Sequence, residues 1–286
     1  MPRIDVDGVK LHYQQTGEGP DVVLIHAFTS NLAVWMMIGI MDELAKDFRV
    51  TSYDLRGHGL SEVTPNGYTS AEMARDFARL HDALELDSAF VVGHSYGGVI
   101  GTHAALEYPE KVSGIILADT YFPGLEHIEP NVADTVIWRE LSNDLGKSGI
   151  DLGEQVDFGR LFEAVKNLTP EQTEAIRESL GPASVRWLAP LGKLAGTTAG
   201  TEMFEEAGLT AERIQSVSVP VVGLYDEQTT FGATCKYLED HLADVRIDVV
   251  PGARHLAPLQ SPVEFTRLVK THLYRMAGLE STVETS

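Results

Sequence analysis

The chain has 286 residues, and its 22 Lys and Arg against 42 Asp and Glu give a formal net charge of −20. A protein this acidic repels phosphate backbones and anionic lipid surfaces, and no run of Lys and Arg is long enough to offset that repulsion locally. The charge therefore argues against a nucleic-acid partner and against a membrane-surface partner.

The composition predicts a folded chain that needs neither metals nor disulfides for its stability. Its 43% hydrophobic and 22% charged residues are ordinary for a globular protein. The single cysteine, Cys235, cannot form an intrachain disulfide, and no Cys/His cluster has the spacing of a zinc site. Residues 1–11 lack the apolar stretch of a signal peptide, and no apolar run approaches the ~18 residues needed to cross a bilayer. We therefore expect a cytoplasmic protein.

The N-terminal part of the chain alternates short β-branched runs with longer helical patterns. Strands are predicted at residues 9–13, 22–25, 48–53, 89–92 and 112–118. Helices are predicted at residues 35–45, 70–84 and 99–108. This alternation is typical of an α/β fold, with a mostly parallel, helix-flanked central sheet.

From about residue 122 to residue 207 the strand pattern stops, and only helical patterns and loops follow. The alternation then resumes, with strands predicted at 217–225 and 245–250 and helices at 231–242 and 262–276. We therefore predict an α/β core domain formed by residues 1–121 and 208–286, with an inserted helical cap domain formed by residues 122–207.

The motif that carries chemistry is Gly93-His94-Ser95-Tyr96-Gly97, which matches G-x-S-x-G between an apolar strand and a helix. Glycines at 93, 97, 98 and 101 allow the strand and the helix to approach closely around a strained turn. Ser95 would then project at the N-terminus of the helix, where unpaired amides favour an anion. This context predicts a nucleophilic serine.

A serine hydroxyl needs a general base near neutral pH, and His255 is the best candidate. It follows the strand predicted at 245–250, so it lies at the same carboxyl edge of the sheet as Ser95. His26, His58 and His94 fall in loops near that edge and could line the site. No G-x-G-x-x-G pattern or metal-ligand spacing accompanies these residues, so we expect no cofactor and no metal.

These motifs together resemble the α/β-hydrolase fold superfamily, specifically its cap-bearing serine hydrolases. The resemblance rests on His26-Ala27-Phe28, on the Asp54-Leu55-Arg56-Gly57-His58-Gly59-Leu60-Ser61 segment, on the turn at Ser95 and on the loop that ends at His255. It implies that Ser95 is the nucleophile and His255 the base, and that the backbone amides of Phe28 and Tyr96 form an oxyanion hole. The family usually has glycine where Ala27 stands.

The sequence departs from the family at the catalytic acid. The usual G-x-x-D pattern, laid on residues 226–229, puts Thr229 where the aspartate belongs. Asp119, at the end of the preceding strand, stands where haloalkane dehalogenases and zearalenone-type lactonases carry their acid, and we assign it that role. An alternative stays open, in which Asp119 only caps the end of its strand and either Asp226 or Glu227 is the acid.

A serine at this turn excludes the alkylation chemistry of relatives with an aspartate nucleophile, and it points to acyl transfer. The predicted cap has an excess of acidic over basic residues, which disfavours anionic substrates. Capped pockets are lined mainly by apolar and aromatic side chains, so Trp138 and Trp187 are predicted to contact substrate, together with His26. We expect hydrolysis of a neutral, fairly hydrophobic carboxylic ester or lactone.

Two other functions fit the same residues. C–C bond hydrolases, lyases and cofactor-independent oxygenases resemble this pattern, and a small-molecule-binding pseudoenzyme would explain the missing acid at Thr229. The sequence does not define the oligomeric state, and a homodimer is one of the open possibilities.

Overall fold

The computed structural model describes residues 2–129 and 136–279. Its described strands form one sheet in the order β1-β2-β4-β3-β5-β6-β7-β8, with β1, β2 and β4 paired antiparallel and the remaining pairs parallel. The strands are β1 (Arg3–Asp5), β2 (Lys10–Thr16), β3 (Asp21–Ile25), β4 (Arg49–Tyr53), β5 (Ala89–His94), β6 (Val112–Ala118), β7 (Val221–Asp226) and β8 (Val245–Val250). The predicted mostly parallel sheet is confirmed.

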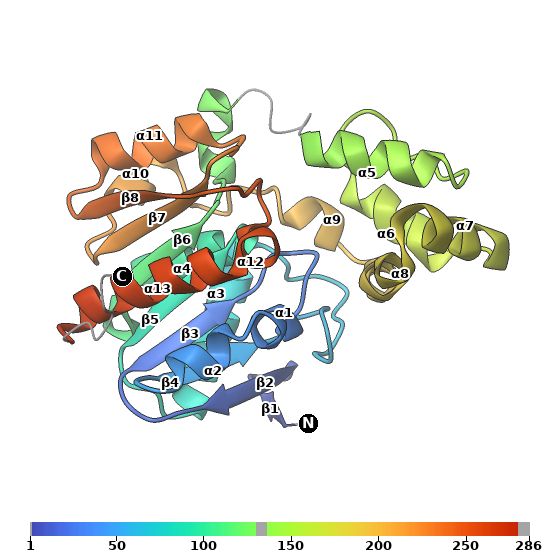
Figure 1. Ribbon diagram of the computed structural model, residues 1–286. Helices are drawn as coiled ribbons and strands as arrows, with labels where there is room; N and C mark the ends of the chain where they lie inside the picture. Colours follow the sequence, from blue (N-terminus) through green and yellow to red (C-terminus); the bar gives the residue numbers. More distant parts are fainter. Residues whose placement is uncertain (1, 130–135, 280–286) are drawn as a thin grey trace.

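Helices cover both faces of the sheet (Figure 1). They are α1 (Ala33–Met37), α2 (Ile40–Leu44), α3 (Ser70–Ala83), α4 (Tyr96–Glu107), α10 (Ala211–Gln215), α11 (Gly232–His241), α12 (Ala257–Gln260) and α13 (Pro262–Ala277). In β3, Val22 and Leu24 belong to the core under α1, α2 and α13, whereas Val23 and Ile25 belong to the core under α3 and α4. Every residue of β3 is therefore buried, which explains its uninterrupted apolar run.

Two helical predictions need correction, and one helix was missed. The helix expected at 35–45 is two short helices, α1 and α2, because Gly39 adopts a left-handed φ of 73° between them. The helix expected from residue 99 begins at Tyr96, directly after Ser95. The helix α10 before β7 was not predicted. The start of α3 is as expected, since the Thr69 side chain accepts a hydrogen bond from the Glu72 amide.

The segment predicted to form the cap is helical and contains no strand where the structure describes it. It holds the 3₁₀ helices η2 (Pro123–Ile128) and η4 (Ala189–Leu194), and the α-helices α5 (Val136–Gly146), α6 (Phe158–Lys166), α7 (Pro170–Leu180), α8 (Pro182–Leu188) and α9 (Ala199–Glu202). Figure 1 shows α5 to α8 gathered to one side of the sheet, with α9 between them and the core. Residues 130–135 of the predicted cap and 280–286 of the predicted core lie outside the described residues.

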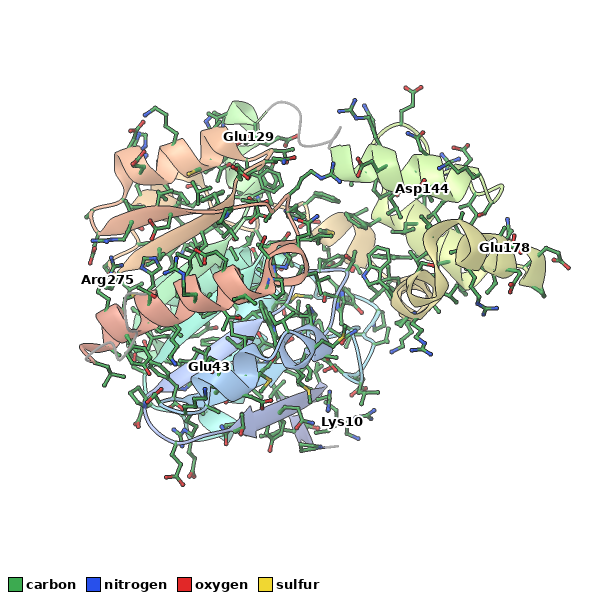
Figure 2. The ribbon with its side chains drawn as sticks, in the orientation of Figure 1. Lys10, Glu43, Glu129, Asp144, Glu178 and Arg275 are labelled. Atoms are coloured by element: carbon green, nitrogen blue, oxygen red, sulfur yellow. The ribbon has the colours of Figure 1, made fainter. Side chains whose placement is uncertain are left out.

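The surface of these outer helices is charged. Asp144 of α5 and Glu178 of α7 lie on the part of the molecule farthest from the sheet (Figure 2). Within residues 2–129 and 136–279, no helix combines the length and the apolar character that a bilayer crossing requires.

Candidate active site

Ser95 occupies a sharp turn between β5 and α4, with φ 52° and ψ −119°. A Cβ atom at Gly93 would overlap the backbone of Gly97, and one at Gly97 would overlap the carbonyl group of Ile25. The strand and the helix can cross this closely only because these positions lack side chains. Ser95 itself is half-buried at the carboxyl edge of the sheet, as the motif predicts.

The imidazole of His255 is bonded to Asp119. Its Nδ1 donates to Asp119 Oδ2 at 2.8 Å, and Asp119 is 0% exposed. Burial acts to raise the pKa of the Asp119 carboxyl, but the hydrogen bond and charge of His255 outweigh burial and hold that pKa below its ordinary value. A charged Asp119 fixes the proton on Nδ1, which leaves Nε2 of His255 as a proton acceptor.

Thr229, at the position of the missing acid, supports Asp119 instead. Its hydroxyl is among the groups that lower the pKa of the Asp119 carboxyl, as is the backbone amide of Asp226, which donates to Asp119 Oδ1 at 3.2 Å. The sequence showed only that the usual carboxylate was absent. Thr229 thus favours the charged form of the carboxyl group that follows the neighbouring strand.

The two alternative acids hold the backbone of the loop that carries His255. Asp226 Oδ2 accepts from the Ala257 amide at 3.2 Å, and Glu227 Oε2 accepts from the Gly252 amide at 2.9 Å. Burial, followed by the charge of Asp119, raises the pKa of the Asp226 carboxyl to about 7. Of the three carboxylates considered from the sequence, Asp119 is therefore the one bonded to the His255 ring.

His94 joins the loop that carries His255 to the turn at Ser95. Its Nε2 donates to the His255 carbonyl oxygen at 2.7 Å, and it directly precedes Ser95 in the chain. Burial, followed by the neighbouring His255, lowers the pKa of His94 to about 4, so the ring is neutral near pH 7. Sequence reasoning placed His94 near the site but missed this contact, because its partner is 161 residues away.

Ser95, Asp119 and His255 all have a strained backbone with positive φ. The described non-glycine residues with positive φ are Asp7, Glu85, Ser95, Asp119, Ala207 and His255. Ser95, Asp119 and His255, at 52°, 43° and 61°, thus make up half of this set. Such conformations cost of order 1–3 kcal/mol each and concentrate at functional sites.

Phe28 and Tyr96, the predicted oxyanion-hole residues, lie next to each other. Their rings meet edge-on with centroids 5.5 Å apart. Tyr96 is the first residue of α4, so its amide has no intrahelical acceptor. The turn before Phe28 is fixed by the Ala27 carbonyl, which accepts from the Ser30 amide at 2.9 Å.

The geometry of His26 argues against the predicted substrate contact. Its ring is 0% exposed, its Nδ1 donates to the Ala27 carbonyl at 2.8 Å, and its Nε2 accepts from the Leu55 amide at 3.0 Å. Burial lowers its pKa, which favours the neutral ring that this pairing requires. With both nitrogens occupied, His26 holds the Phe28 turn against the loop after β4.

The two predicted cap tryptophans have different surroundings. Trp138 is 3% exposed and packs edge-on against Phe158, with ring centroids 5.5 Å apart. Trp187 is 41% exposed and lines a narrow cleft. The other walls of this cleft are residues 29–31, residues 57–59 and the cap residues Pro190, Leu191 and Leu194. Trp187 is therefore the tryptophan beside the loop that follows Phe28.

A larger open groove of about 680 Å³ lies on the cap, between residues 152–157, α6 and α9. Phe204 forms part of its wall and stacks on Phe158, with centroids 5.9 Å apart. Phe158 also lies 6.0 Å from Phe28 by ring centroids. This aromatic cluster therefore stands between the groove and the predicted oxyanion loop.

Comparison with known proteins identifies the family of the chain. A family model described as the alpha/beta hydrolase fold matches residues 20–158. A Bacillus subtilis protein, provisionally named a 2-succinyl-6-hydroxy-2,4-cyclohexadiene-1-carboxylate synthase, is 28% identical over 93% of this chain and 96% of its own. The pimeloyl-[acyl-carrier protein] methyl ester esterase of Vibrio atlanticus is 30% identical over 75% of this chain and 78% of its own. The solved structure of Est816, described as an N-acyl homoserine lactone degrading enzyme, aligns with a TM-score of 0.66 and 26% identity, covering 94% of this chain and 99% of that one. The chain belongs to the α/β-hydrolase fold family.

Proposed function

We propose that this protein is a serine hydrolase that cleaves a neutral, fairly hydrophobic carboxylic ester or lactone through an acyl-enzyme on Ser95. The observation that carries the proposal is the position of His255. Its ring is bonded to the buried carboxylate of Asp119, and its carbonyl is bonded to the residue that precedes Ser95. An oriented histidine, held by its loop to the residue before a strained serine, is an arrangement that supports acyl transfer.

In the proposed mechanism, Ser95 Oγ attacks the carbonyl carbon while His255 Nε2 takes its proton. Asp119 stabilises the imidazolium that forms. The C–O bond to the leaving alcohol then breaks, and the alcohol takes the proton from Nε2. A water molecule, deprotonated by His255, then attacks the acyl carbon. The bond between that carbon and Ser95 Oγ breaks, Oγ takes the proton from Nε2, and the carboxylic acid leaves. The amides of Phe28 and Tyr96 stabilise the tetrahedral oxyanions by about 3 kcal/mol each.

The substrate class is inferred from the surroundings of this site. The ring centroids of Phe28, Phe158 and Phe162 lie within 6.2 Å of one another. The predicted cap also carries more acidic than basic residues. Such walls favour an apolar, uncharged acyl or alcohol group. The names of the Vibrio esterase and of the lactone-degrading Est816 support cleavage of an acyl C–O bond in this chain as well.

A second candidate is a C–C bond lyase or hydrolase reaction by the same three side chains. It is favoured by the Bacillus subtilis relative, whose name describes a synthase rather than a hydrolase. A reaction of that class uses His255 for proton transfer without requiring an acyl group on Ser95, so the two candidates differ in whether an acyl-enzyme accumulates.

Pre-steady-state hydrolysis of p-nitrophenyl acetate and butyrate, with a panel of simple lactones, tests the proposal. We expect a burst of p-nitrophenol equal to the enzyme concentration, and a loss of roughly 10⁴-fold or more in kcat for Ser95→Ala. Ser216→Ala, at an exposed serine after α10, is the control and should leave kcat unchanged. Absence of both a burst and lactone turnover would favour the second candidate.

A further inference from the structure

Two contacts join the predicted cap to the core next to the proposed catalytic residues. The first is an anchor at α9, where Glu202 Oε2 accepts from the backbone amides of Gly67 at 2.9 Å and Tyr68 at 2.6 Å. The Tyr68 carbonyl in turn accepts from the Tyr96 hydroxyl at 2.8 Å. The anchor therefore reaches the residue that follows Ser95 through hydrogen bonds.

The second contact is an ion pair between α5 and the loop of the base. Arg254, directly before His255, donates from Nη1 to Glu140 Oε1 at 3.0 Å and from Nη2 to Glu140 Oε2 at 2.8 Å. This is the two-point geometry that fixes a guanidinium relative to a carboxylate. It joins residues 114 positions apart and ties the cap to the His255 loop.

The two contacts differ in how readily they open. Glu202 is half-buried, and its single oxygen holds two backbone donors, which are charge-assisted hydrogen bonds of the stronger kind. Arg254 and Glu140 have side chains that are 37% and 50% exposed, so water and salt compete with their pairing. The cap is thus held firmly at α9 and reversibly at α5.

Opening of the Arg254–Glu140 pair can affect the imidazole of His255 through the loop that carries both Arg254 and His255. From the core, the loop is held by Asp226 at Ala257, by Glu227 at Gly252 and by His94 at His255. His255 itself has a strained backbone, at φ 61°. A strained residue keeps its conformation only while its surroundings impose it, and Arg254 is the adjacent residue that reaches the cap.

We propose that Glu140 and Arg254 form a latch that couples the position of α5 to the position of His255. This inference rests on the proposed function, in which His255 is the base. With the pair formed, α5 is tied to the loop of His255 and the imidazole is held in position. With the pair open, α5 is released from that loop and His255 loses part of its support. Glu140 and Arg254 are positioning residues in this scheme.

Hydrogen–deuterium exchange tests the coupling without any substrate. We expect Glu140→Gln to raise exchange in residues 251–258 above that of the wild-type protein. Glu174→Gln, which removes an equally exposed pair with Arg177 inside α7, should leave that segment unchanged. The charge-swapped variant carrying Glu140→Arg and Arg254→Glu should restore protection. Equal exchange in wild-type protein and Glu140→Gln would overturn the proposal.

Kinetics then test whether the latch acts on the base. In Glu140→Gln we expect kcat for a p-nitrophenyl ester to fall about two- to fivefold with KM less affected, as for an exposed pair. The wild-type kcat should fall when salt is raised, and that of the variant should not. A change in KM alone would mean that the pair merely covers the site. If the wild-type protein hydrolyses neither an ester nor a lactone, the proposed function fails, while the exchange experiment still decides the latch.

Discussion

The carboxyl edge of the sheet and the helices beside it are held together by different kinds of contact. At the edge, Asp119, His94 and Asp226 are each at most 5% exposed. The Asp226 amide donates to Asp119, and His94 donates to the carbonyl oxygen of His255. The predicted cap contacts the core through aromatic packing, through the hydrogen bonds that Glu202 accepts from the core backbone, and through the exposed Arg254–Glu140 ion pair.

This difference separates two tasks. Proton transfer needs groups held within a fraction of an ångström, which buried hydrogen bonds and strained backbones provide. Substrate selection needs a surface that can open and repack, which short helices with exposed pairs allow. Substitutions at the edge should therefore change kcat or the pH dependence, whereas substitutions in the cap away from the Glu140–Arg254 pair should change KM or stability.

The largest effect is expected for Asp119→Asn. An asparagine cannot stabilise the imidazolium or fix the tautomer, so kcat should fall by about 10⁴-fold with KM little changed. Glu227→Gln is the matched control, because Glu227 bonds only to the Gly252 amide among the contacts described here, and it should lose far less activity. The assignment of Asp119 is wrong if Glu227→Gln or Asp226→Asn is inactive while Asp119→Asn is not.

Phe28→Ala should break the link between the two regions. The Phe28 ring contacts Tyr96 in the core and both Phe158 and Phe162 in the predicted cap, so its loss should cost about 3–4 kcal/mol in urea unfolding. KM should rise as well, because the cap loses its support. Phe48→Ala, buried under the opposite face, should destabilise similarly without raising KM. Equal KM values in the two variants would contradict the linking role.

Asp226→Asn should change how stability depends on pH. The pKa of Asp226 is raised to about 7 in the fold, so its contribution to stability is fully present below its unfolded pKa and is lost as pH rises through 7. Asparagine cannot ionise. Between pH 5 and pH 8 the wild-type protein should therefore lose about 2 kcal/mol more stability than the variant. Parallel unfolding curves at the two pH values would show that Asp226 does not titrate in this range.

The smallest effect on activity is expected for Trp187→Ala, which should differ from Trp138→Ala in whether KM or stability changes. Trp187→Ala should raise KM roughly three- to tenfold with under about 1 kcal/mol of destabilisation, because Trp187 is exposed at the cleft. Trp138→Ala should mainly lower stability, since Trp138 is buried against Phe158. Urea unfolding and steady-state kinetics of both variants measure this. The reverse pattern would assign the substrate contact to Trp138.

Much of the core could be predicted because its signals are local. The buried strands β3 and β6 contain continuous apolar runs, and the glycines around Ser95 are those that the close turn requires. The break in the helix expected at 35–45 escaped prediction, because apolar spacing continues through Gly39 and does not report its left-handed φ. Periodicity describes which face is buried, not where the backbone turns.

The site was predicted less completely, because its contacts join distant segments. Asp119 could be inferred from the missing aspartate at Thr229, but the support that Thr229 gives it could not. His26 was assigned to substrate from its place in a loop, whereas its ring is used by the backbone of Ala27 and Leu55. A histidine near the site can bind substrate or can hold a loop in place. Only its hydrogen-bond partners show which of the two it does.

The central claim is that Ser95 is activated by a base that Asp119 orients, and covalent labelling tests it most directly. A fluorophosphonate probe, followed by peptide mass spectrometry, should modify Ser95 rapidly in the wild-type protein, slowly in His255→Ala and not at all in Ser95→Ala. Labelling that is equally slow in the wild-type protein and in His255→Ala would contradict the account, because the serine would then have no functioning base.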